Sequence, residues 1–227
     1  MIVPIKKINK SEAEWLGTHY CKHGHTYLNH YDCYLSEKPA DAPYYEKVGY
    51  FDIETTGLKA DFAYMFSYAI LMEDENKILG RVLAPKEIRN GHFDKDLVGE
   101  MCRDLKGCHR VVVHYGGDRR FDCPFARTRA IKHGHDFPLY RDTYVSDTWL
   151  MSKNKLLLRS NRLATIAEFF GIPAKTHPLT PDVWQKASAG DEKSLAFIWE
   201  HNCEDVVTTQ AVYKLLEPYL RKAKTSI

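Results

Sequence analysis

The stretch that decides the fold is Gly49–Leu58, which reads GYFDIETTGL. Its apolar first half, bounded by polar residues, predicts a buried central strand over residues 48–53. Because side chains alternate across a strand, Asp52 and Glu54 leave the same face of the sheet. Like charges so close repel each other, and burial removes their hydration. A cation or bound protons can offset this cost in free energy. We interpret the pair as ligands of a hard cation such as Mg²⁺ or Mn²⁺; the alternative is an exposed strand end whose acids meet water.

Regular elements surround this strand. Residues 63–72 and 77–84 follow closely enough to pair with it antiparallel, which predicts a three-stranded meander. The valine run at 110–114 and residues 145–150 predict a fourth and a fifth strand. Helical spacing of apolar residues occurs at 96–105, 121–133, 162–170 and 194–216. This order predicts an α/β domain in which helices flank a mixed sheet on both faces.

Length and composition narrow the class of protein. The chain has 227 residues, 44% of them hydrophobic, and a net charge of +2, so it can bury one full core beside a small appendage. The weak net charge means that affinity for nucleic acid must come from local patches or metals. No apolar run has the length of a signal peptide or a membrane span, which predicts a cytoplasmic protein without a membrane partner.

The residue composition and the pattern of apolar residues change near residue 47. Residues 1–47 hold a dense Cys/His/Tyr cluster, followed by the stretch SEKPADAPYYEK, whose prolines and small polar residues are typical of a connector. We therefore expect a Cys/His-rich segment at 1–47 and a main domain at 48–220.

Within that segment, CKHGHTYLNHYDC places five metal-ligand side chains in residues 21–33. In a reducing compartment, clustered cysteines indicate metal binding rather than disulfides. The spacing C-x₃-H-x₄-H-x₂-C suits a tetrahedral structural Zn²⁺, and His23 can replace His25 in it. The alternative is a polar surface hairpin rich in histidine. The predicted zinc ligands are Cys21, His25, His30 and Cys33.

Three later residues are candidates to join the strand acids. His201 and Asp205 are four apart in HNCEDVVTTQAVY, so they share a helix face with apolar residues and point inward; alone, they would be interpreted as a core histidine and a solvated acid. Asp122 follows the valine strand and a glycine turn at the start of a helix. That position suits either a helix cap or a ligand beside the sheet edge. Asp147 is a further acid, expected to support the others.

In this order, FDIETTGL, FDCPFARTRA and HNCEDVVTTQAVY resemble the three exonuclease motifs of the DEDD superfamily. Its members are ribonuclease H-like 3′→5′ exonucleases that include polymerase proofreading domains. The resemblance covers residues 48–217 and implies a ribonuclease H-like fold. It also implies two Mg²⁺ or Mn²⁺ ions that cleave nucleic acid to nucleoside 5′-monophosphates. The implied metal ligands are Asp52, Glu54, Asp122 and Asp205, with Asp52 bridging the two ions.

The same resemblance implies that His201 is the general base. Members with a histidine place it five residues before the aspartate, whereas this chain has His-x-x-x-Asp. His201 therefore stands where the subtype of B-family polymerases and their single-domain relatives has tyrosine. The second motif is also one residue longer than usual before Phe121. The chain also resembles phage and archaeal relatives that have a similar Cys/His stretch ahead of the first motif.

Basic and aromatic residues near the motifs are candidates to contact nucleic acid. Tyr115 and Phe121 would stack on bases, unless they are core residues. Cations that would follow phosphates, or else line solvated loops, are Arg127, Arg129, Lys132, Lys153, Lys155, Arg159 and Arg162. The leading hypothesis is a metal-dependent 3′→5′ exonuclease that digests nucleic acid with a free 3′ end, single-stranded DNA above all. Its rivals are an endonuclease of the same fold and a catalytically silent nucleic-acid-binding protein.

Overall fold

The computed structural model describes residues 10–37, 39, 42, 47–73, 75–139, 142–173 and 179–220. Contacts divide the chain into two units, Met1–Glu46 and Lys47–Ile227. Most of the predicted connector, residues 38, 40, 41 and 43–46, lies outside the described residues, as do residues 1–9 of the Cys/His-rich segment.

A mixed sheet of five strands organises the larger unit, in the order β3-β2-β1-β4-β5. The first three strands form the predicted antiparallel meander, while β4 pairs parallel with both β1 and β5. The sequence prediction of a mixed sheet is thereby confirmed. The strands are β1 (Val48–Thr55), β2 (Met65–Met72), β3 (Lys77–Val82), β4 (Arg110–Val113) and β5 (Tyr144–Asp147).

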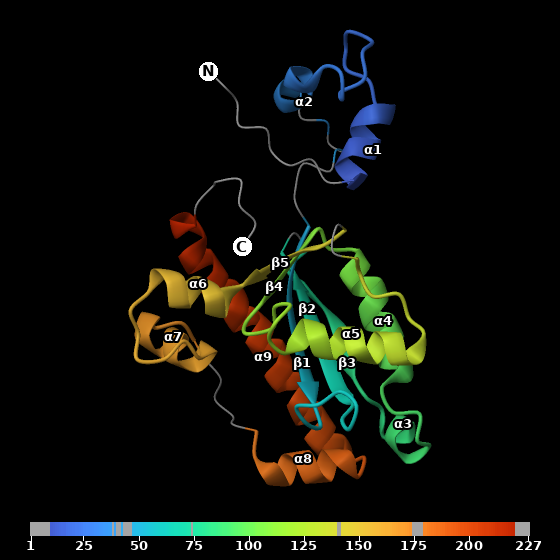
Figure 1. Cartoon of the computed structure of the whole chain (residues 1–227), viewed down its shortest axis with the longest axis vertical. Coiled ribbons are helices and arrows are strands. Elements are labelled where there is room, and N and C mark those ends of the chain that lie inside the picture. The colour runs from blue at the N-terminus through green and yellow to red at the C-terminus, as the bar shows by residue number, and fades with distance from the viewer. Residues whose placement is uncertain are drawn as a thin grey trace. The chain divides into compact units, whose positions relative to one another are not determined.

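Helices cover both faces of this sheet (Figure 1). On one face, α4 (Lys95–Lys106) and α5 (Asp122–His133) pack on Phe51 and Ile70. The other face carries α6 (Thr148–Lys155), α7 (Leu163–Phe170) and the long α9 (Glu192–Leu216). The short elements are α3 (Pro85–Arg89), α8 (Pro181–Ser188) and the 3₁₀ helix η1 (Glu217–Tyr219). Among the described residues, no helix combines the length and apolarity that a bilayer span requires.

The fifth strand differs from its prediction. The sequence predicts a strand over residues 145–150, but β5 ends at Asp147 and α6 begins at Thr148. The Asp147 carboxylate accepts hydrogen bonds from the backbone N–H groups of Trp149 and Leu150, at 2.9 and 3.4 Å, and so caps the helix. Apolar residues at 149–151 therefore belong to a helix, because a local side-chain cap outweighs their strand propensity.

The smaller unit contains α1 (Lys10–Thr18) and α2 (Tyr31–Glu37), joined by a loop in which Tyr20 and Thr26 form an isolated bridge. Buried Tyr34 donates a hydrogen bond to the buried carboxylate of Glu12 at 3.2 Å, which ties the two helices together. Its small core consists of Leu16, Cys21, Tyr27, Cys33 and Tyr34.

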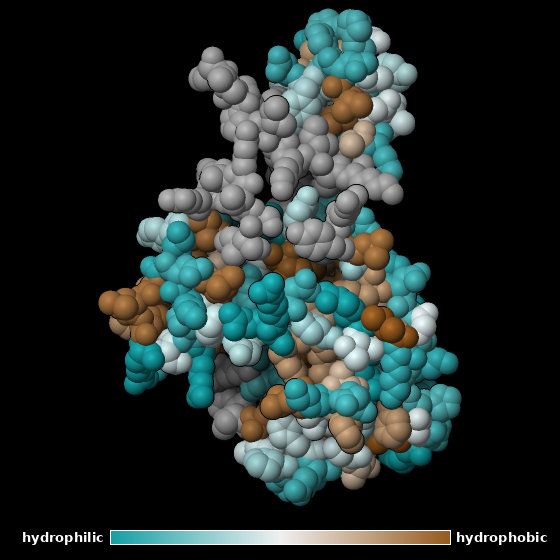
Figure 2. Space-filling model, viewed as in Figure 1, coloured by the Kyte–Doolittle hydropathy of each residue, from teal (hydrophilic) through white to brown (hydrophobic). Residues whose placement is uncertain are grey.

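Hydrophobic side chains also reach the surface of the larger unit. Figure 2 shows them gathered over α6 and α7. Phe169 and Phe170, at the end of α7, pack edge to face with ring centroids 5.0 Å apart, and Phe169 is 68% exposed. Leu157, in the loop that joins the two helices, is fully exposed.

Candidate active site

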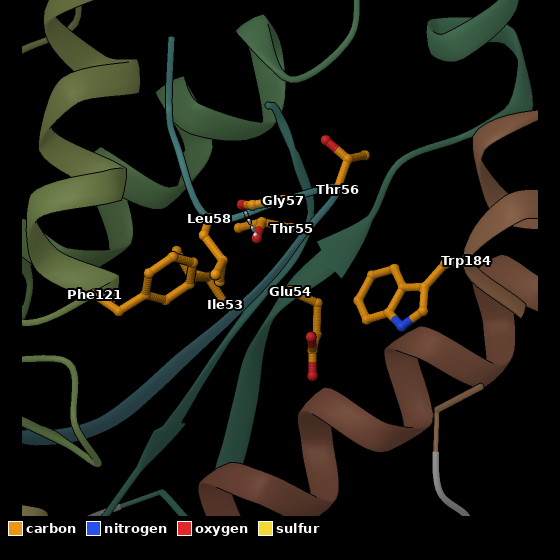
Figure 3. A pocket seen from close by; sticks show the side chains of 8 residues that line it. All are labelled: Ile53, Glu54, Thr55, Thr56, Gly57, Leu58, Phe121 and Trp184. Carbon is orange, nitrogen blue, oxygen red and sulfur yellow. Dashed lines mark hydrogen bonds between the residues drawn. The ribbon is translucent and has the colours of Figure 1, made fainter. Parts of the chain in front are cut away.

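The two acids of β1 lie on one side of the strand, as their spacing predicts. Asp52 and Glu54 are partly buried, whereas Phe51 and Ile53 are buried in the core that α4 and α5 cover. The Glu54 side chain extends toward α9 (Figure 3). Strand alternation therefore directs apolar side chains to the core and the carboxylates to the helix that carries the third motif.

Asn202 on α9 holds Asp52 in place. Its Nδ2 donates a hydrogen bond of 2.6 Å to Asp52 Oδ2, and its Oδ1 accepts one of 2.9 Å from Ser67 Oγ on β2. Because Asn202 is fully buried and both ends of its amide are engaged, its side chain has one orientation. The sequence analysis missed this residue. The available signal was its place on a buried helix stripe, four residues after Ile198 and four before Val206.

Glu54, His201 and Asp205 converge beside this pair. His201 Nε2 lies 3.7 Å from Glu54 Oε1 and 3.8 Å from Asp205 Oδ2. One ligand atom from each residue lies within 4.8 Å of the other two. The spacing of four residues on α9 thus places the imidazole between two carboxylates from different elements.

Asp122, at the start of α5, lies within electrostatic reach of these acids. It is only 4% exposed and is the first residue of the helix; Phe121 occupies the cap position, so the capping role considered for Asp122 does not apply. Burial raises the pKa of the Asp122 carboxyl well above its usual value, and neighbouring negative charges raise it further. The carboxylates responsible are those of Glu54, Asp147 and Asp205.

Gly116 makes room for Asp122. A Cβ atom on Gly116 would lie 2.1 Å from Asp122 Oδ2, far inside van der Waals contact. The preceding residue, Tyr115, has a positive φ of 61°, and its N–H donates to Asp147 Oδ1 at 3.0 Å. Gly117 N–H donates to Asp147 Oδ2 at 3.1 Å. Asp147 therefore fixes the turn after β4 as well as the start of α6, a supporting role that fits its expected place.

A shallow pocket opens next to Glu54, with a volume of about 340 Å³ (Figure 3). The turn after β1 forms its floor, where Thr55 Oγ1 donates to Gly57 O at 2.8 Å. Phe121 and Leu58 line one side, and Trp184 of α8 lines the other. Of these aromatic residues the sequence analysis proposed Phe121 but not Trp184, because α8 is distant in the chain and carries no motif.

Tyr115 belongs to a cluster of aromatic and basic side chains, which also contains Arg120, Trp149 and Lys153. The Arg120 guanidinium lies 4.0 Å from the Trp149 ring centroid and 4.9 Å from that of Tyr115. Lys153 Nζ lies 5.2 Å from the Trp149 centroid. The Tyr115 side chain is 46% exposed. This surface thus combines positive charge with aromatic rings that the cations contact through cation–π interactions.

The other cations predicted to contact phosphate differ in their exposure and in their ion pairs. Arg129 is a correction: it is buried and forms an ion pair with buried Asp94, so it cannot meet a phosphate. Arg127 pairs with Asp118, and Arg159 pairs with Glu168 at 3.1 Å. Exposed residues among the remaining candidates are Lys132, Lys155 and Arg162.

In the smaller unit, four side chains place ligand atoms within 4.8 Å of one another: Cys21, His23, His30 and Cys33. His25 was the predicted member of this group, with His23 as its substitute; in the structure His23 occupies that place. The ring of His25 instead packs against His30, with centroids 4.9 Å apart. Residue spacing alone did not separate them, because both histidines lie in the same tight turn.

Comparisons with known proteins show the family and the fold of the larger unit. The sequence profile of the RNase H superfamily matches residues 49–217. No curated protein matches the chain in sequence. The zinc-bound complex of E. coli exonuclease I with single-stranded DNA aligns with a TM-score of 0.50 at 15% identity, over 78% of this chain and 41% of that one. Apo exonuclease I aligns with a TM-score of 0.48 at 12% identity, over 77% and 43%. The chain thus spans less than half the length of these enzymes, and the likeness is one of fold.

Proposed function

Because this chain belongs to the RNase H superfamily, we propose that it is a metal-dependent 3′→5′ exonuclease of the DEDD type. The observation that carries the proposal is the convergence of acids from separate elements around His201. Glu54 comes from β1 and Asp205 comes from α9. Asp52, on the same side of β1 as Glu54, accepts a hydrogen bond from Asn202 of α9. Buried Asp122 joins them from α5, close enough to be influenced by the charges of Glu54 and Asp205.

The chemistry of these residues fits divalent metal ions. Carboxylate oxygens are the preferred ligands of Mg²⁺ and Mn²⁺, and like charges held this close favour a cation among them. Asp122 supports this point, because its burial and, to a smaller extent, the neighbouring carboxylates raise its pKa and disfavour its ionised form. When bound, such ions polarise phosphate oxygens and make a water molecule more acidic. The residues that would hold them are Asp52, Glu54, Asp122 and Asp205.

The protein residues would then orient the reaction. Asn202 keeps Asp52 turned toward the site through its bond of 2.6 Å. Water attacks the terminal phosphodiester, its oxygen bonds to phosphorus, and the bond from phosphorus to the 3′ oxygen breaks. His201 takes the proton of that water, since its Nε2 lies between Glu54 and Asp205 and histidine exchanges protons near neutral pH. The departing 3′ oxygen acquires a proton from solvent, which leaves a nucleoside 5′-monophosphate.

Two features support single-stranded nucleic acid as the substrate. The pocket beside Glu54 offers the rings of Phe121 and Trp184 to a terminal base. The cluster of Tyr115, Arg120, Trp149 and Lys153 offers cations and ring faces to the nucleotides that follow. The backbone N–H of Tyr115 donates a hydrogen bond to Asp147, and the charge of Asp147 raises the pKa of Asp122. The cluster therefore begins near the acids.

The direction of digestion provides the test. With Mg²⁺ or Mn²⁺, a single strand labelled at its 5′ end should shorten stepwise and release nucleoside 5′-monophosphates, identified by chromatography. The same strand with a blocked 3′ end should stay intact, and EDTA should stop the reaction. DNA, RNA and duplex substrates compared at equal concentration would establish the preference, which we expect to be for single-stranded DNA.

Other outcomes would identify the rival functions. Cleavage of a circular single strand, or internal cuts in the blocked strand, would indicate an endonuclease. Tight binding to all these substrates without any metal-dependent cleavage would indicate a silent nucleic-acid-binding protein and would refute the exonuclease proposal.

Replacing Asn202 with alanine should lower turnover by about 10- to 100-fold and raise the Mg²⁺ concentration needed for half-maximal activity, as for other residues that orient metal ligands. The cause is the lost bond of 2.6 Å to Asp52. Initial rates across a Mg²⁺ titration, with thermal unfolding measured in parallel, check this expectation.

Ser67→Ala is the matched variant, because it removes the support of Asn202 but leaves Asn202 bonded to Asp52. We expect a smaller change in both quantities. An unchanged Mg²⁺ dependence in Asn202→Ala would show that Asn202 stabilises the fold without positioning Asp52.

A further inference from the structure

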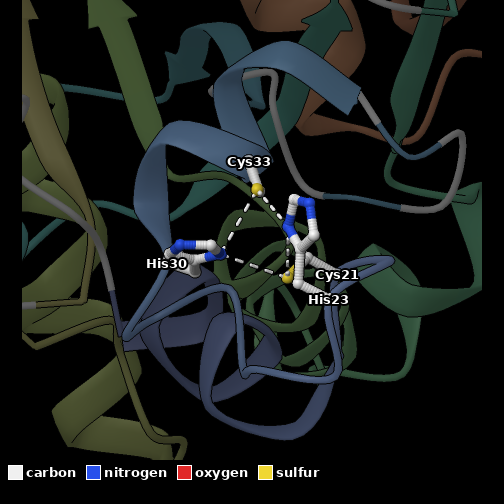
Figure 4. A group of neighbouring side chains, drawn as sticks. All are labelled: Cys21, His23, His30 and Cys33. Atoms are coloured by element: carbon white, nitrogen blue, oxygen red, sulfur yellow. Dashed lines mark hydrogen bonds between the residues drawn. The ribbon is translucent and has the colours of Figure 1, made fainter.

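We propose that the smaller unit binds one structural Zn²⁺ ion through four side chains: Cys21, His23, His30 and Cys33 (Figure 4). This site is separate from the carboxylate centre in both residues and chemistry. Two thiolates and two imidazoles prefer Zn²⁺ to Mg²⁺, whereas the carboxylates prefer hard cations.

The distances between ligand atoms match those of a zinc tetrahedron. His30 Nδ1 lies 3.4 Å from Cys21 Sγ and 3.3 Å from Cys33 Sγ. His23 Nδ1 lies 3.3 Å from Cys33 Sγ and 3.9 Å from Cys21 Sγ. Zinc bonds of about 2.3 Å to sulfur and about 2.0 Å to nitrogen give tetrahedral edges of about 3.5 Å. Each histidine thus presents Nδ1 to both sulfur atoms at distances close to those edges.

Local backbone structure holds the ligands in two pairs. Cys21 and His23 lie on a tight turn in which Gly24 N–H donates to Cys21 O at 2.9 Å. Gly24 has a φ of 75°, a conformation that glycine adopts without strain. His30 directly precedes α2 and Cys33 lies in its first turn, where Cys33 N–H donates to His30 O at 3.0 Å. Little reorganisation is therefore needed to bind the ion.

The unit needs the ion for stability. Among the described residues of the unit, the core cluster has five buried members, and two of them, Cys21 and Cys33, are proposed ligands. Folding units below about 70 residues seldom gain enough stability from a hydrophobic core alone, and they commonly add a metal ion or disulfides. Free energy of metal binding becomes free energy of folding in such units. All four ligands come from the protein and leave no open position, so the site is structural rather than catalytic.

Elemental analysis of the full-length protein, dialysed against Mg²⁺ buffer, tests the proposal. We expect about one zinc per chain in the parent protein and in Asp52→Asn, whose change affects only the carboxylate centre. Cys33→Ser and His23→Asn should lose the zinc. The matched controls His25→Asn and Cys203→Ser should retain it, because the structure excludes both residues from the group.

Cobalt substitution of the parent protein provides a second readout that involves no substitution and is therefore unaffected by misfolding of a variant. Co²⁺ should give the intense visible bands of tetrahedral coordination and a thiolate charge-transfer band, both of which excess Zn²⁺ should remove. A zinc-free parent protein, a Cys21–Cys33 disulfide in its intact mass, or zinc lost from His25→Asn but kept in His23→Asn would overturn the assignment. None of these results depends on nuclease activity.

Discussion

Asp52→Asn should lower metal-dependent nuclease activity by a factor of about 10³ or more, because metal-ion stabilisation of the transition state is worth several kcal/mol and each 1.36 kcal/mol changes the rate about tenfold. Asparagine keeps the size of the side chain and an oxygen that can accept the bond from Asn202. The lost quantity is therefore the negative charge. Single-turnover digestion of a 5′-labelled strand at saturating Mg²⁺ measures the effect.

Asp96→Asn is the matched control, since it makes the same chemical change at an exposed residue in the first turn of α4. We expect its activity to equal that of the parent protein. If Asp52→Asn kept activity within tenfold of the parent, the carboxylate centre proposed here would be wrong. A normal thermal unfolding temperature in Asp52→Asn would establish that the loss is chemical.

Arg129→Met should reduce the free energy of unfolding by about 3–5 kcal/mol, the usual cost of leaving one partner of a buried ion pair alone. Arg129 Nε donates to Asp94 Oδ2 at 2.8 Å, and Nη1 donates to Ala60 O at 3.0 Å. Asp94 is completely buried and also accepts from Met65 N–H at 2.9 Å. Without Arg129, the Asp94 carboxylate retains the hydrogen bond from Met65 N–H and the contact with His133 Nε2 at 3.0 Å.

Denaturant unfolding of the Mg²⁺-free protein measures this change, and the unfolding temperature should fall by about 10 °C or more. Arg103→Met, at an exposed position of α4, should change the free energy of unfolding by no more than about 0.5 kcal/mol. Adding Asp94→Asn to Arg129→Met should recover part of the loss, because it removes the unpaired charge. A parent-like stability in Arg129→Met would contradict a structural role for the pair.

The strand acids and the third motif were predictable because they depend on short periodicities. Alternation along β1 set the common side of Asp52 and Glu54, and the helical repeat set that of His201 and Asp205. Charged side chains that point inward need a compensating partner, and the motifs themselves indicated a metal ion as that partner. The first four strands were predictable for a similar reason, since each contains a short apolar run, whereas β5 is the short sequence YVSD and its predicted end was wrong.

Asn202, Trp184 and Arg129 were not predictable in their roles. Asn202 is neutral and acts through bonds to Asp52 and Ser67, which are 150 and 135 residues away. Trp184 lines the pocket from α8, a helix far along the chain from the strand and turn that form the rest of the pocket. Arg129 shares a basic stretch with exposed cations, and only its packing against Asp94 distinguishes it.

By itself, the sequence determined the α/β fold, the order of the carboxylate motifs and the presence of a Cys/His cluster, because local spacing decides which side chains share a face. Tertiary structure alone decided which of these groups meet. It brought His23 and not His25 into the Cys/His group, buried Asp122 within electrostatic reach of Glu54 and Asp205 instead of at a helix cap, and paired Arg129 with buried Asp94. Such choices depend on distances between segments far apart in the chain, where packing and the cost of burying charge outweigh local preference.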